Sequence, residues 1–321
     1  MNARAIGRRE SRSGYDTEDR MSVGSSSDGL GDLVDSNSRV EPLATGFSMT
    51  EGPIWMPDGS LHFSDMPDDK RRRWHSEDGV SVIRDPSNRC NGMTRDSLGN
   101  LLVCEHVTSR VVREAPDGSS EVVASLYRGK ELNSPNDVIV ASDDSVLFTD
   151  PDYGRTYPPV GLERPVELDF RGVYRVPVEG GEPQLLMHDF GEPNGLCFSP
   201  DESLLYVNDT SRAHIRVFDV GSNYQLSNGR VFAEGIGESV PGSGLVDGMK
   251  ADERGNVYVT GPRGIWVFDP SGRKLGEIEV PDETTNLNWG DEDWRTLYIT
   301  AHNSIYRMRM NVAGNRLPYM T

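Results

Sequence analysis

The sequence predicts an all-β protein, a six-bladed β-propeller with four-stranded blades around a central channel. Three observations lead to this fold class. Short apolar runs, rich in Val, Ile, Leu, Tyr and Phe, alternate with turns such as Pro57-Asp58-Gly59. Long segments with the 3.6-residue period of a helix do not occur. One pattern, a short strand, a turn and a stronger strand, recurs six times.

The six copies define the blades and their register. Their first residues are Glu51, Asn91, Asn136, Asn194, Asp247 and Asn286. Eight residues later each copy reaches its turn, at Gly59, Gly99, Asp144, Glu202, Gly255 and Trp294. Successive copies begin 39 to 58 residues apart, which leaves room for four strands per blade. We expect the segment VEPLATGFSM, residues 40–49, to supply a strand that closes the ring with the last blade.

Composition sets the domain boundaries and the class of partner. Residues 1–38 are polar, rich in Ser, Gly and Asp, and are expected to form a disordered tail, whereas 39–321 form one propeller domain. The net charge of -18 disfavours nucleic acid and anionic membranes and suits cations or neutral substrates. The basic run at residues 70–73 is expected to lie on an exposed strand.

Localisation and assembly follow from what the sequence lacks. It contains no apolar run long enough to span a membrane and no secretory signal. Its three cysteines, Cys90, Cys104 and Cys197, have no metal-ligand spacing and indicate free thiols in a reducing compartment. We therefore expect a cytoplasmic protein, a monomer or a weak homo-oligomer.

The first position of every repeat carries a side-chain oxygen. In a propeller the first strand of each blade lines the central channel, so these positions form a ring at one mouth. Two carboxylates and four amides would be costly to bury together unless a hard divalent cation satisfied them. Oxygen ligands favour Ca²⁺, with Mg²⁺, Mn²⁺ or Zn²⁺ as alternatives. The competing interpretation is that Asn-Gly and Asp-Gly pairs simply form turns.

Five segments, in order, resemble one family: EGPIW, SPNDVIV, FTDPDYG, PNGLCFSPDE and VDGMKADERGNVYV. They are similar to the senescence marker protein (regucalcin)/gluconolactonase/luciferin-regenerating enzyme family, and CEH and LNSPND make bacterial-type gluconolactonases the nearest match in appearance. The resemblance covers about residues 42–312. It implies a propeller that binds a divalent ion and hydrolyses sugar lactones.

The resemblance also assigns roles to particular residues. Glu51, Asn194 and Asp247 match the family's metal ligands, and Asn136 matches the asparagine that faces metal and substrate. Asp247 matches the proposed proton donor or acceptor. Asn91 and Asn286 share the ring but are not ligands that the family requires. Regucalcin-type members have an arginine where this chain has Ser134, so one substrate contact is missing.

Other candidate residues come from position along the chain. His106 follows the second strand of its blade, and Tyr153 lies in the long insert at residues 151–170, so both are candidates for binding the substrate. Asp247 is the catalytic candidate, since a carboxylate must move a proton to the leaving ring oxygen; His106 is the alternative base. HExxH, GxSxG and P-loop motifs are absent, which excludes those hydrolase classes.

Three functions remain open at this point. The first is a divalent-metal-dependent lactonase that acts on lactones such as gluconolactone. The second is a phosphotriester hydrolase of the diisopropyl fluorophosphatase kind, which uses a similar ring of ligands. The third is a non-enzymatic calcium-binding propeller.

Overall fold

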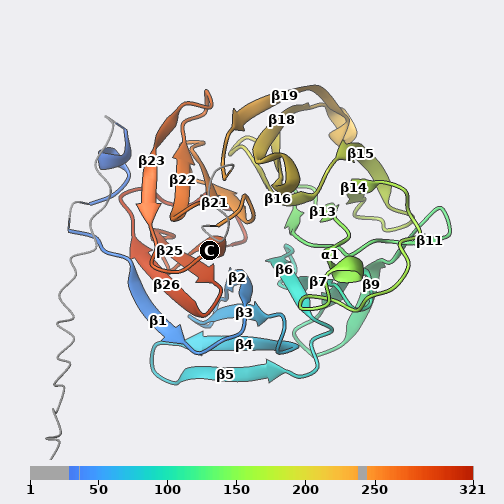
Figure 1. Ribbon diagram of the computed structural model, residues 1–321, viewed down its shortest axis with the longest axis horizontal. Helices are drawn as coiled ribbons and strands as arrows, with labels where there is room; N and C mark the ends of the chain where they lie inside the picture. Colours follow the sequence, from blue (N-terminus) through green and yellow to red (C-terminus); the bar gives the residue numbers. More distant parts are fainter. Residues whose placement is uncertain (1–28, 36, 238–243, 321) are drawn as a thin grey trace, which may run out of the picture.

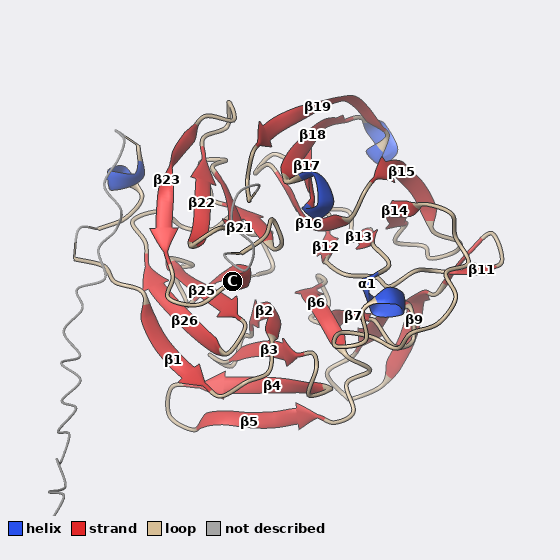
Figure 2. Ribbon diagram, in the orientation of Figure 1, coloured by secondary structure: helices blue, strands red, loops and turns tan. Residues whose placement is uncertain are grey.

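The computed structural model of the protein describes residues 29–35, 37–237 and 244–320. Six antiparallel four-stranded sheets surround a central axis (Figure 1). Strands form nearly all of the regular structure, and the helical segments are single turns (Figure 2). The prediction of a six-bladed β-propeller is confirmed.

Each blade runs from an innermost strand at the axis to an outermost strand at the rim. Blade one comprises β2 (Thr50–Trp55), β3 (Leu61–Asp65), β4 (Lys70–His75) and β5 (Gly79–Arg84). Blade two comprises β6 (Cys90–Arg95), β7 (Leu101–Glu105), β8 (Arg110–Glu114) and β9 (Ser120–Ala124). Blade three comprises β12 (Val138–Val140), β13 (Val146–Asp150), β14 (Arg171–Val176) and β15 (Gln184–Phe190).

The remaining three blades follow the same order. Blade four comprises β16 (Pro193–Phe198), β17 (Leu204–Asp209), β18 (His214–Val220) and β19 (Leu226–Glu234). Blade five comprises β20 (Met249–Ala251), β21 (Val257–Gly261), β22 (Gly264–Phe268) and β23 (Lys274–Glu279). Blade six comprises β24 (Thr284–Gly290), β25 (Thr296–Ala301), β26 (Ser304–Arg309) and β1 (Glu41–Thr45).

Short elements decorate this framework. They are η1 (Leu30–Asp32), the hairpin β10 (Leu126–Tyr127) and β11 (Lys130–Glu131), α1 (Tyr153–Thr156), η2 (Thr210–Arg212) and η3 (Ser222–Tyr224). Of these, α1 belongs to the long insert between β13 and β14.

The turn between the first two strands adopts the same backbone conformation in every blade. The six predicted turn residues all have positive φ angles, 78° at Gly59, 80° at Gly99, 62° at Asp144, 55° at Glu202, 82° at Gly255 and 54° at Trp294. The left-handed region is open to Gly and tolerated by polar residues, but is unusual for Trp. Trp294 is held there by burial, with 6% of its surface exposed. The repeat register therefore holds in the sixth copy too.

The ring closes through strands from opposite ends of the chain. β1 pairs with β26 in antiparallel register, with Glu41 opposite Arg307 and Thr45 opposite Ser304. The side chains of the first pair also form an ion pair, with 3.0 Å between Nε and Oε2. The strand expected within residues 40–49 is confirmed, and closure leaves blade six without a missing strand.

The apolar core is divided among the interfaces between neighbouring blades. Between blades one and six, for example, Leu61 and Phe63 pack with Tyr298 and Ile305. Comparable clusters occupy each of the other five interfaces in the described part of the chain. Because the faces of the sheets use their apolar side chains against one another, the axis is left to polar groups at the channel mouth.

The C-terminal segment covers the end of the axis opposite the first residues of the innermost strands. In Figure 1 the C-terminus lies at the centre of the ring. The Asn315 amide donates to the carbonyl of Ala251 at 2.9 Å, and the Tyr319 hydroxyl donates to the carbonyl of Arg95 at 3.1 Å. Both acceptors lie at the far ends of innermost strands, so the C-terminal segment lies across this mouth of the channel.

The predicted boundary of the disordered tail at residue 38 is too late. Leu30, Leu33 and Val34 are 3 to 5% exposed and join the cluster between blades five and six. Their spacing places all three on one side of the η1 turn, which packs on β23 against Leu275. The polar composition of the segment hid this short apolar group. The rest of the predicted tail, residues 1–28, lies outside the described residues.

The basic run at residues 70–73 forms β4, where acidic side chains neutralise it. Arg72 pairs with Asp65 at 2.8 Å, and Arg71 pairs with Glu114 at 2.5 Å. Among the described residues, no helix is long and apolar enough to cross a membrane.

Two N-terminal deletions should separate the docked residues from those before them. Removing residues 1–35 exposes the patch that Leu30, Leu33 and Val34 cover, and full burial of one such side chain contributes about 1.5–3 kcal/mol. We expect this deletion to lower the melting temperature clearly. Removing residues 1–28, the matched control, should leave it nearly unchanged. Equal melting temperatures for the two proteins would show that the docked turn contributes nothing.

Candidate functional site

Five of the six ring residues meet at one mouth of the channel. Glu51, Asn91, Asn136, Asn194 and Asp247 line a single cavity of about 160 Å³. Each lies at or just before the start of an innermost strand, so the repeat brings residues from five blades together. The predicted proximity of these five side chains is therefore observed.

Close packing of the innermost strands is what narrows the ring. Gly92 donates its amide to the carbonyl of Asn136 at 2.8 Å, and Gly195 donates to the carbonyl of Asp247 at 3.1 Å. A Cβ atom on Gly195 would lie 2.3 Å from that carbonyl oxygen, and one on Gly52 would lie 2.1 Å from the carbonyl oxygen of Asn91. The glycine after a ring residue thus permits contact between blades. Asn91-Gly92 lies within β6 and Asn194-Gly195 within β16, and Asp247-Gly248 directly precedes β20 outside any turn, so the alternative that these pairs form turns is wrong.

The two carboxylates of the ring are crowded. Burial raises the pKa of the Glu51 carboxyl to about 7, although hydrogen bonds from Asn286 and from the Gly52 amide lower it. Burial also raises the pKa of Asp247 well above its usual value, and the negative charges of Glu51 and Asp137 add to the rise. Two acidic groups that repel each other in a buried cavity favour a cation between them.

A lysine beneath the ring offsets part of this charge. Lys250 Nζ lies 3.3 Å from Asp137 Oδ2 and donates to the carbonyl of Met249 at 3.1 Å. Asp137 is 2% exposed and directly follows the ring residue Asn136. No pattern in the sequence marks this pair, because Lys250 stands three residues after Asp247 and has no counterpart in the other repeats.

The sixth ring residue does not line the cavity. Asn286 Nδ2 donates to Glu51 Oε2 at 2.9 Å, and its Oδ1 accepts from the amide of Leu287 at 2.8 Å. Both ends of this side chain are therefore used. Asn286 fixes the Glu51 carboxylate in place, together with the Gly52 amide, which donates to the same oxygen at 2.6 Å.

His106 lies in the cavity wall, as predicted for a pocket residue. It is 1% exposed, and its Nδ1 lies 3.0 Å from the carbonyl oxygen of Val160. Its Nε2 lies 3.3 Å from Asn91 Nδ2. Burial lowers its pKa to about 4, and the charges of Arg164 and Arg89 act in the same direction. The imidazole is therefore neutral at pH 7, although the hydrogen bond to the Val160 carbonyl raises its pKa and partly opposes the effect of burial.

The insert at residues 151–170 forms a lid over the cavity. Its residues Tyr153, Tyr157 and Val160 line the cavity, so Tyr153 lies where the sequence placed it. Burial raises the pKa of the Tyr153 phenol. Arg89, from blade two, donates to the carbonyls of Pro158 and Gly161 and so ties the lid to its neighbour.

Two further arginines hold the lid from within. Arg155 is 2% exposed and donates to the carbonyls of Asn133 at 2.8 Å and Pro165 at 2.6 Å. Arg164 donates to the carbonyl of His106 at 3.1 Å. These carbonyls belong to the lid and to the loops beneath it, so guanidinium groups fasten the lid, while Leu168 near its end joins the apolar cluster between blades two and three.

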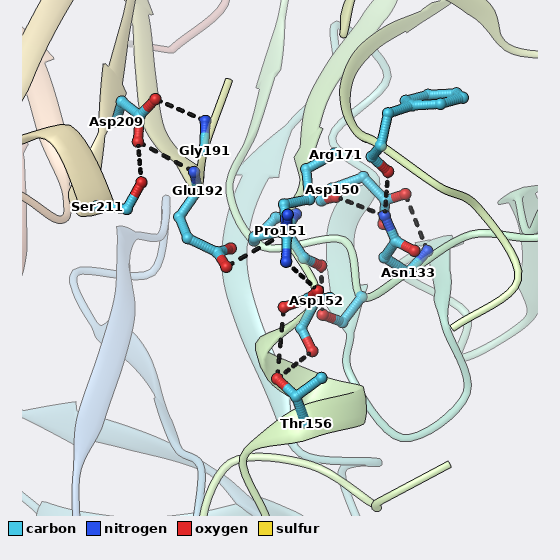
Figure 3. Close-up of polar contacts among 12 residues, drawn as sticks. Asn133, Asp150, Pro151, Asp152, Thr156, Arg171, Gly191, Glu192, Asp209 and Ser211 are labelled. Carbon is cyan, nitrogen blue, oxygen red and sulfur yellow. Dashed lines mark hydrogen bonds and ion pairs between the residues drawn. The ribbon is translucent and has the colours of Figure 1, made fainter. Parts of the chain in front are cut away.

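Polar contacts fix the base of the lid between blades three and four (Figure 3). Arg171 pairs with Asp152 at 2.6 Å and with Glu192 at 3.3 Å. Asp209 accepts from the amides of Gly191 and Glu192 at 2.7 and 3.0 Å. Burial raises the pKa of Glu192 to about 7, and the charge of Asp152 contributes. This network sets the position from which the lid begins.

Ser134, where regucalcin-type members have arginine, is part of this lid anchor. Its hydroxyl donates to the carbonyl of Pro151 at 2.6 Å and accepts from the amide of Gly154 at 2.9 Å. A Cβ on Gly154 would lie 2.6 Å from the Ser134 Cβ, so the lid rests directly on this serine. The close contact with the lid requires a small residue at this position. The chain therefore combines a serine in place of the arginine with a closely packed lid.

The donors present suit a hard divalent cation. The ring offers two carboxylates and amide oxygens, and Asn91 Oδ1 is buried with no hydrogen-bond partner among the described residues. Burying a carbonyl oxygen without a hydrogen-bond partner costs free energy, and a bound cation would remove that cost. No group of three or more His, Cys, Asp or Glu side chains suited to a metal occurs in the described ranges, so amides must supply part of any coordination sphere.

The cavity also has lining residues that the sequence did not single out. They are Met49, Met66, Tyr157, Val160, Thr210 and Leu245. Most are apolar and come from loops outside the repeat, so no periodic signal marks them. Thr210 is the polar exception, and its hydroxyl accepts from Asn194 Nδ2 at 3.2 Å.

Comparison with known proteins assigns the chain to a family. Residues 49–303 match the family described as the SMP-30/Gluconolactonase/LRE-like region. The chain belongs to this family. A gluconolactonase of Zymomonas mobilis is 32% identical over 310 residues, which cover 88% of this chain and 84% of the relative.

Solved structures of the SMP-30/gluconolactonase family agree with the fold. A gluconolactonase from Xanthomonas campestris superimposes with a TM-score of 0.80 at 33% identity, over 88% of this chain and 92% of that chain. A regucalcin from Agrobacterium tumefaciens, described as a calcium-binding protein, gives a TM-score of 0.68 at 19% identity, over 86% and 97%. The resemblance inferred from the sequence motifs is confirmed.

The glycines that follow four of the six ring residues, Gly52, Gly92, Gly195 and Gly248, should not tolerate a larger side chain. In Gly195→Ala the new methyl group would meet the backbone carbonyl of Asp247, which cannot move without shifting its blade, so we expect a loss of about 1–3 kcal/mol of stability. Denaturant unfolding measures this loss. Gly31→Ala is the matched control, because its Cβ would meet nothing within 4 Å. Equal effects of the two substitutions would contradict the requirement for close contact.

Proposed function

We propose that the protein is a divalent-cation-dependent lactonase that opens neutral sugar lactones, such as gluconolactone, to the hydroxy acid. The observation that carries this proposal is the meeting of the buried Glu51 carboxylate, the half-buried Asp247 carboxylate and three amides on the floor of one cavity. The similarity to gluconolactonases of Zymomonas mobilis and Xanthomonas campestris supports lactone hydrolysis. It extends over most of each chain.

The residues that would hold the cation are Glu51, Asn136, Asn194 and Asp247, with Ca²⁺ favoured by the all-oxygen donors. When bound, such an ion supplies Lewis acidity toward the lactone carbonyl and lowers the pKa of a water molecule. Glu51 is the best-fixed ligand, because the Gly52 amide and the Asn286 amide both donate to its Oε2. Those bonds hold its carboxylate in one orientation.

Two side chains of the cavity, those of Asn136 and Asp247, carry out the remaining steps of the proposed reaction. The Asn136 amide lines the cavity and is placed to orient the lactone carbonyl and to stabilise the oxyanion that develops there. Asp247 takes the proton of the attacking water and gives it to the ring oxygen as the C–O bond breaks. The hydroxy acid then carries the water's oxygen on its carboxyl group, and the Asp247 carboxylate is regenerated.

The cavity favours a small, uncharged substrate. The lid side chains Tyr153, Tyr157 and Val160 cover it and restrict water. The described residues that line it include no lysine or arginine, while two acids lie on its floor. A phosphorylated or sulfonated lactone would therefore meet like charge without a compensating partner. Apolar side chains in the wall suit the C–H faces of a sugar ring.

The cysteines favour a reducing compartment, which is the basis for proposing a cytoplasmic location. Cys90, Cys104 and Cys197 are all free and buried. Burial raises the pKa of each thiol, which makes them inert packing groups rather than nucleophiles.

Lactone turnover before and after chelation tests this function. We expect the purified protein to open glucono-1,5-lactone, to lose that activity when treated with a chelator, and to regain it with Ca²⁺, Mg²⁺ or Mn²⁺. The cation should also raise the melting temperature, since binding at 100 times the dissociation constant stabilises the folded state by about 2.7 kcal/mol. Full activity in the stripped protein would rule out the metal-dependent mechanism.

Two comparison substrates sharpen the result. The 6-phosphate of the same lactone should be opened far more slowly, because the cavity has no basic side chain to receive it. Diisopropyl fluorophosphate tests the phosphotriesterase alternative, which gains support if it is hydrolysed and the lactones are not. Cation binding without turnover of any of these substrates would leave a non-enzymatic calcium-binding protein.

Isosteric substitutions separate the proton carrier from the pure ligand. Asp247→Asn keeps an oxygen donor but cannot move a proton, so kcat at saturating cation should fall by about 10²- to 10⁴-fold. Glu51→Gln should mainly weaken cation affinity, with activity recovering as the cation concentration rises. Each variant is titrated with cation so that occupancy and turnover are measured independently. Normal kcat in saturated Asp247→Asn would make Asp247 a ligand alone and His106 the next candidate base.

A further inference from the structure

A chain of hydrogen bonds connects the lid to a ring residue that the family does not require as a ligand. The lid carbonyl of Val160 lies 3.0 Å from His106 Nδ1, and His106 Nε2 lies 3.3 Å from Asn91 Nδ2. His106 is 1% exposed and Asn91 3% exposed, so water does not compete for these contacts. Asn91 Oδ1, the other end of the amide, is buried without a partner among the described residues.

The direction of each hydrogen bond follows from its acceptor. A backbone carbonyl can only accept, so His106 Nδ1 must carry the hydrogen. The neutral imidazole then presents a lone pair at Nε2, which accepts from the Asn91 NH₂ group. That leaves Asn91 Oδ1 turned away from His106. Because Asn91 lines the same cavity as Glu51 and Asp247, this oxygen belongs to the polar floor.

Asn286 shows that ring position alone does not produce this arrangement. It occupies the equivalent place in the sixth repeat, but its Oδ1 is capped by the Leu287 amide at 2.8 Å and its Nδ2 is used by Glu51 at 2.9 Å. The histidine is what distinguishes the second blade. An imidazole that occupies the NH₂ end of the amide leaves the oxygen end available for a ligand.

We propose that Asn91 supplies a further carbonyl oxygen to the cation in this cavity, and that His106 is the positioning residue that turns the amide toward it. The proposal rests on the proposed function only in requiring that a cation binds. It assigns Asn91 and His106 to one unit, held in place by the lid carbonyl of Val160. Arg89 and Arg164, which fasten the lid to blade two, keep that carbonyl over the imidazole.

Calcium binding to the purified full chain, measured by titration calorimetry, tests the assignment directly. Asn91→Ala removes the oxygen, and we expect the affinity to fall by about 10- to 100-fold, as for the loss of other groups that support a metal site. His106→Phe keeps the bulk of the ring but frees the amide to rotate, so the affinity should fall by a smaller factor. His106→Gln can accept from Asn91 and donate to Val160, so it should restore most of the affinity.

The double variant Asn91→Ala/His106→Phe shows whether the two residues act as one. If His106 acts through Asn91, the double variant binds calcium no more weakly than Asn91→Ala alone. Additive losses would overturn the positioning role. Unchanged calcium affinity in Asn91→Ala would overturn the ligand assignment. If the KM for the lactone rose while calcium affinity stayed the same, the Asn91 oxygen would bind the substrate and not the cation.

Two controls keep these outcomes distinct from other failures. The metal-free melting temperature of each variant shows general loss of packing, and a purely structural role would lower it without changing the calcium affinity. Asn288→Ala is the matched asparagine control, because Asn288 bonds Pro53 and Trp289 outside the cavity and should leave calcium affinity unchanged. If the wild-type chain binds no divalent cation, both this inference and the metal-dependent function fail, whereas wild-type binding with an unaffected Asn91→Ala overturns the inference alone.

Discussion

The site depends on how closely the innermost strands approach one another at the channel mouth. Hydrogen bonds such as Gly92 to the Asn136 carbonyl and Gly195 to the Asp247 carbonyl join consecutive blades there. They form only because Gly92 and Gly195, the residues that follow Asn91 and Asn194, lack a side chain, since a Cβ on either would lie within 3 Å of the neighbouring backbone. The same contact that closes the ring therefore sets the distance between its carboxylates and amides.

That closeness creates an electrostatic problem which the fold solves only in part. The apolar clusters lie between blades, so the axis contains Glu51, Asp137 and Asp247 with Lys250 as the positive group beside them. The repulsion that remains between these carboxylates adds to the effect of burial and raises the pKa values of Glu51 and Asp247. A divalent cation would relieve it at the place where catalysis needs a positive charge, which is why structural crowding and the proposed function coincide.

Features that repeat could be predicted from the sequence, and features that occur once could not. The blades, the turn eight residues into each copy and the closing strand follow from the repeat, and so does the meeting of Glu51, Asn136, Asn194 and Asp247. Asn286 departs from the ring because the neighbouring Leu287 amide captures its oxygen, a side-chain choice that no spacing reveals. The docking of Leu30 was likewise concealed within a polar segment.

The lid is the part of the site that lies outside the repeated pattern of the blades. Its base lies on Ser134, whose hydroxyl bridges Pro151 and Gly154, and the contact is so close that a Cβ on Gly154 would lie 2.6 Å from the Ser134 Cβ. The insert brings Tyr153, Tyr157 and Val160 over the cavity. Val160 also contacts His106, so the segment that covers the cavity is the one that would orient Asn91. In the proposed function a single loop would therefore influence both substrate selection and the geometry of the polar floor, while the six blades provide the fixed frame beneath it.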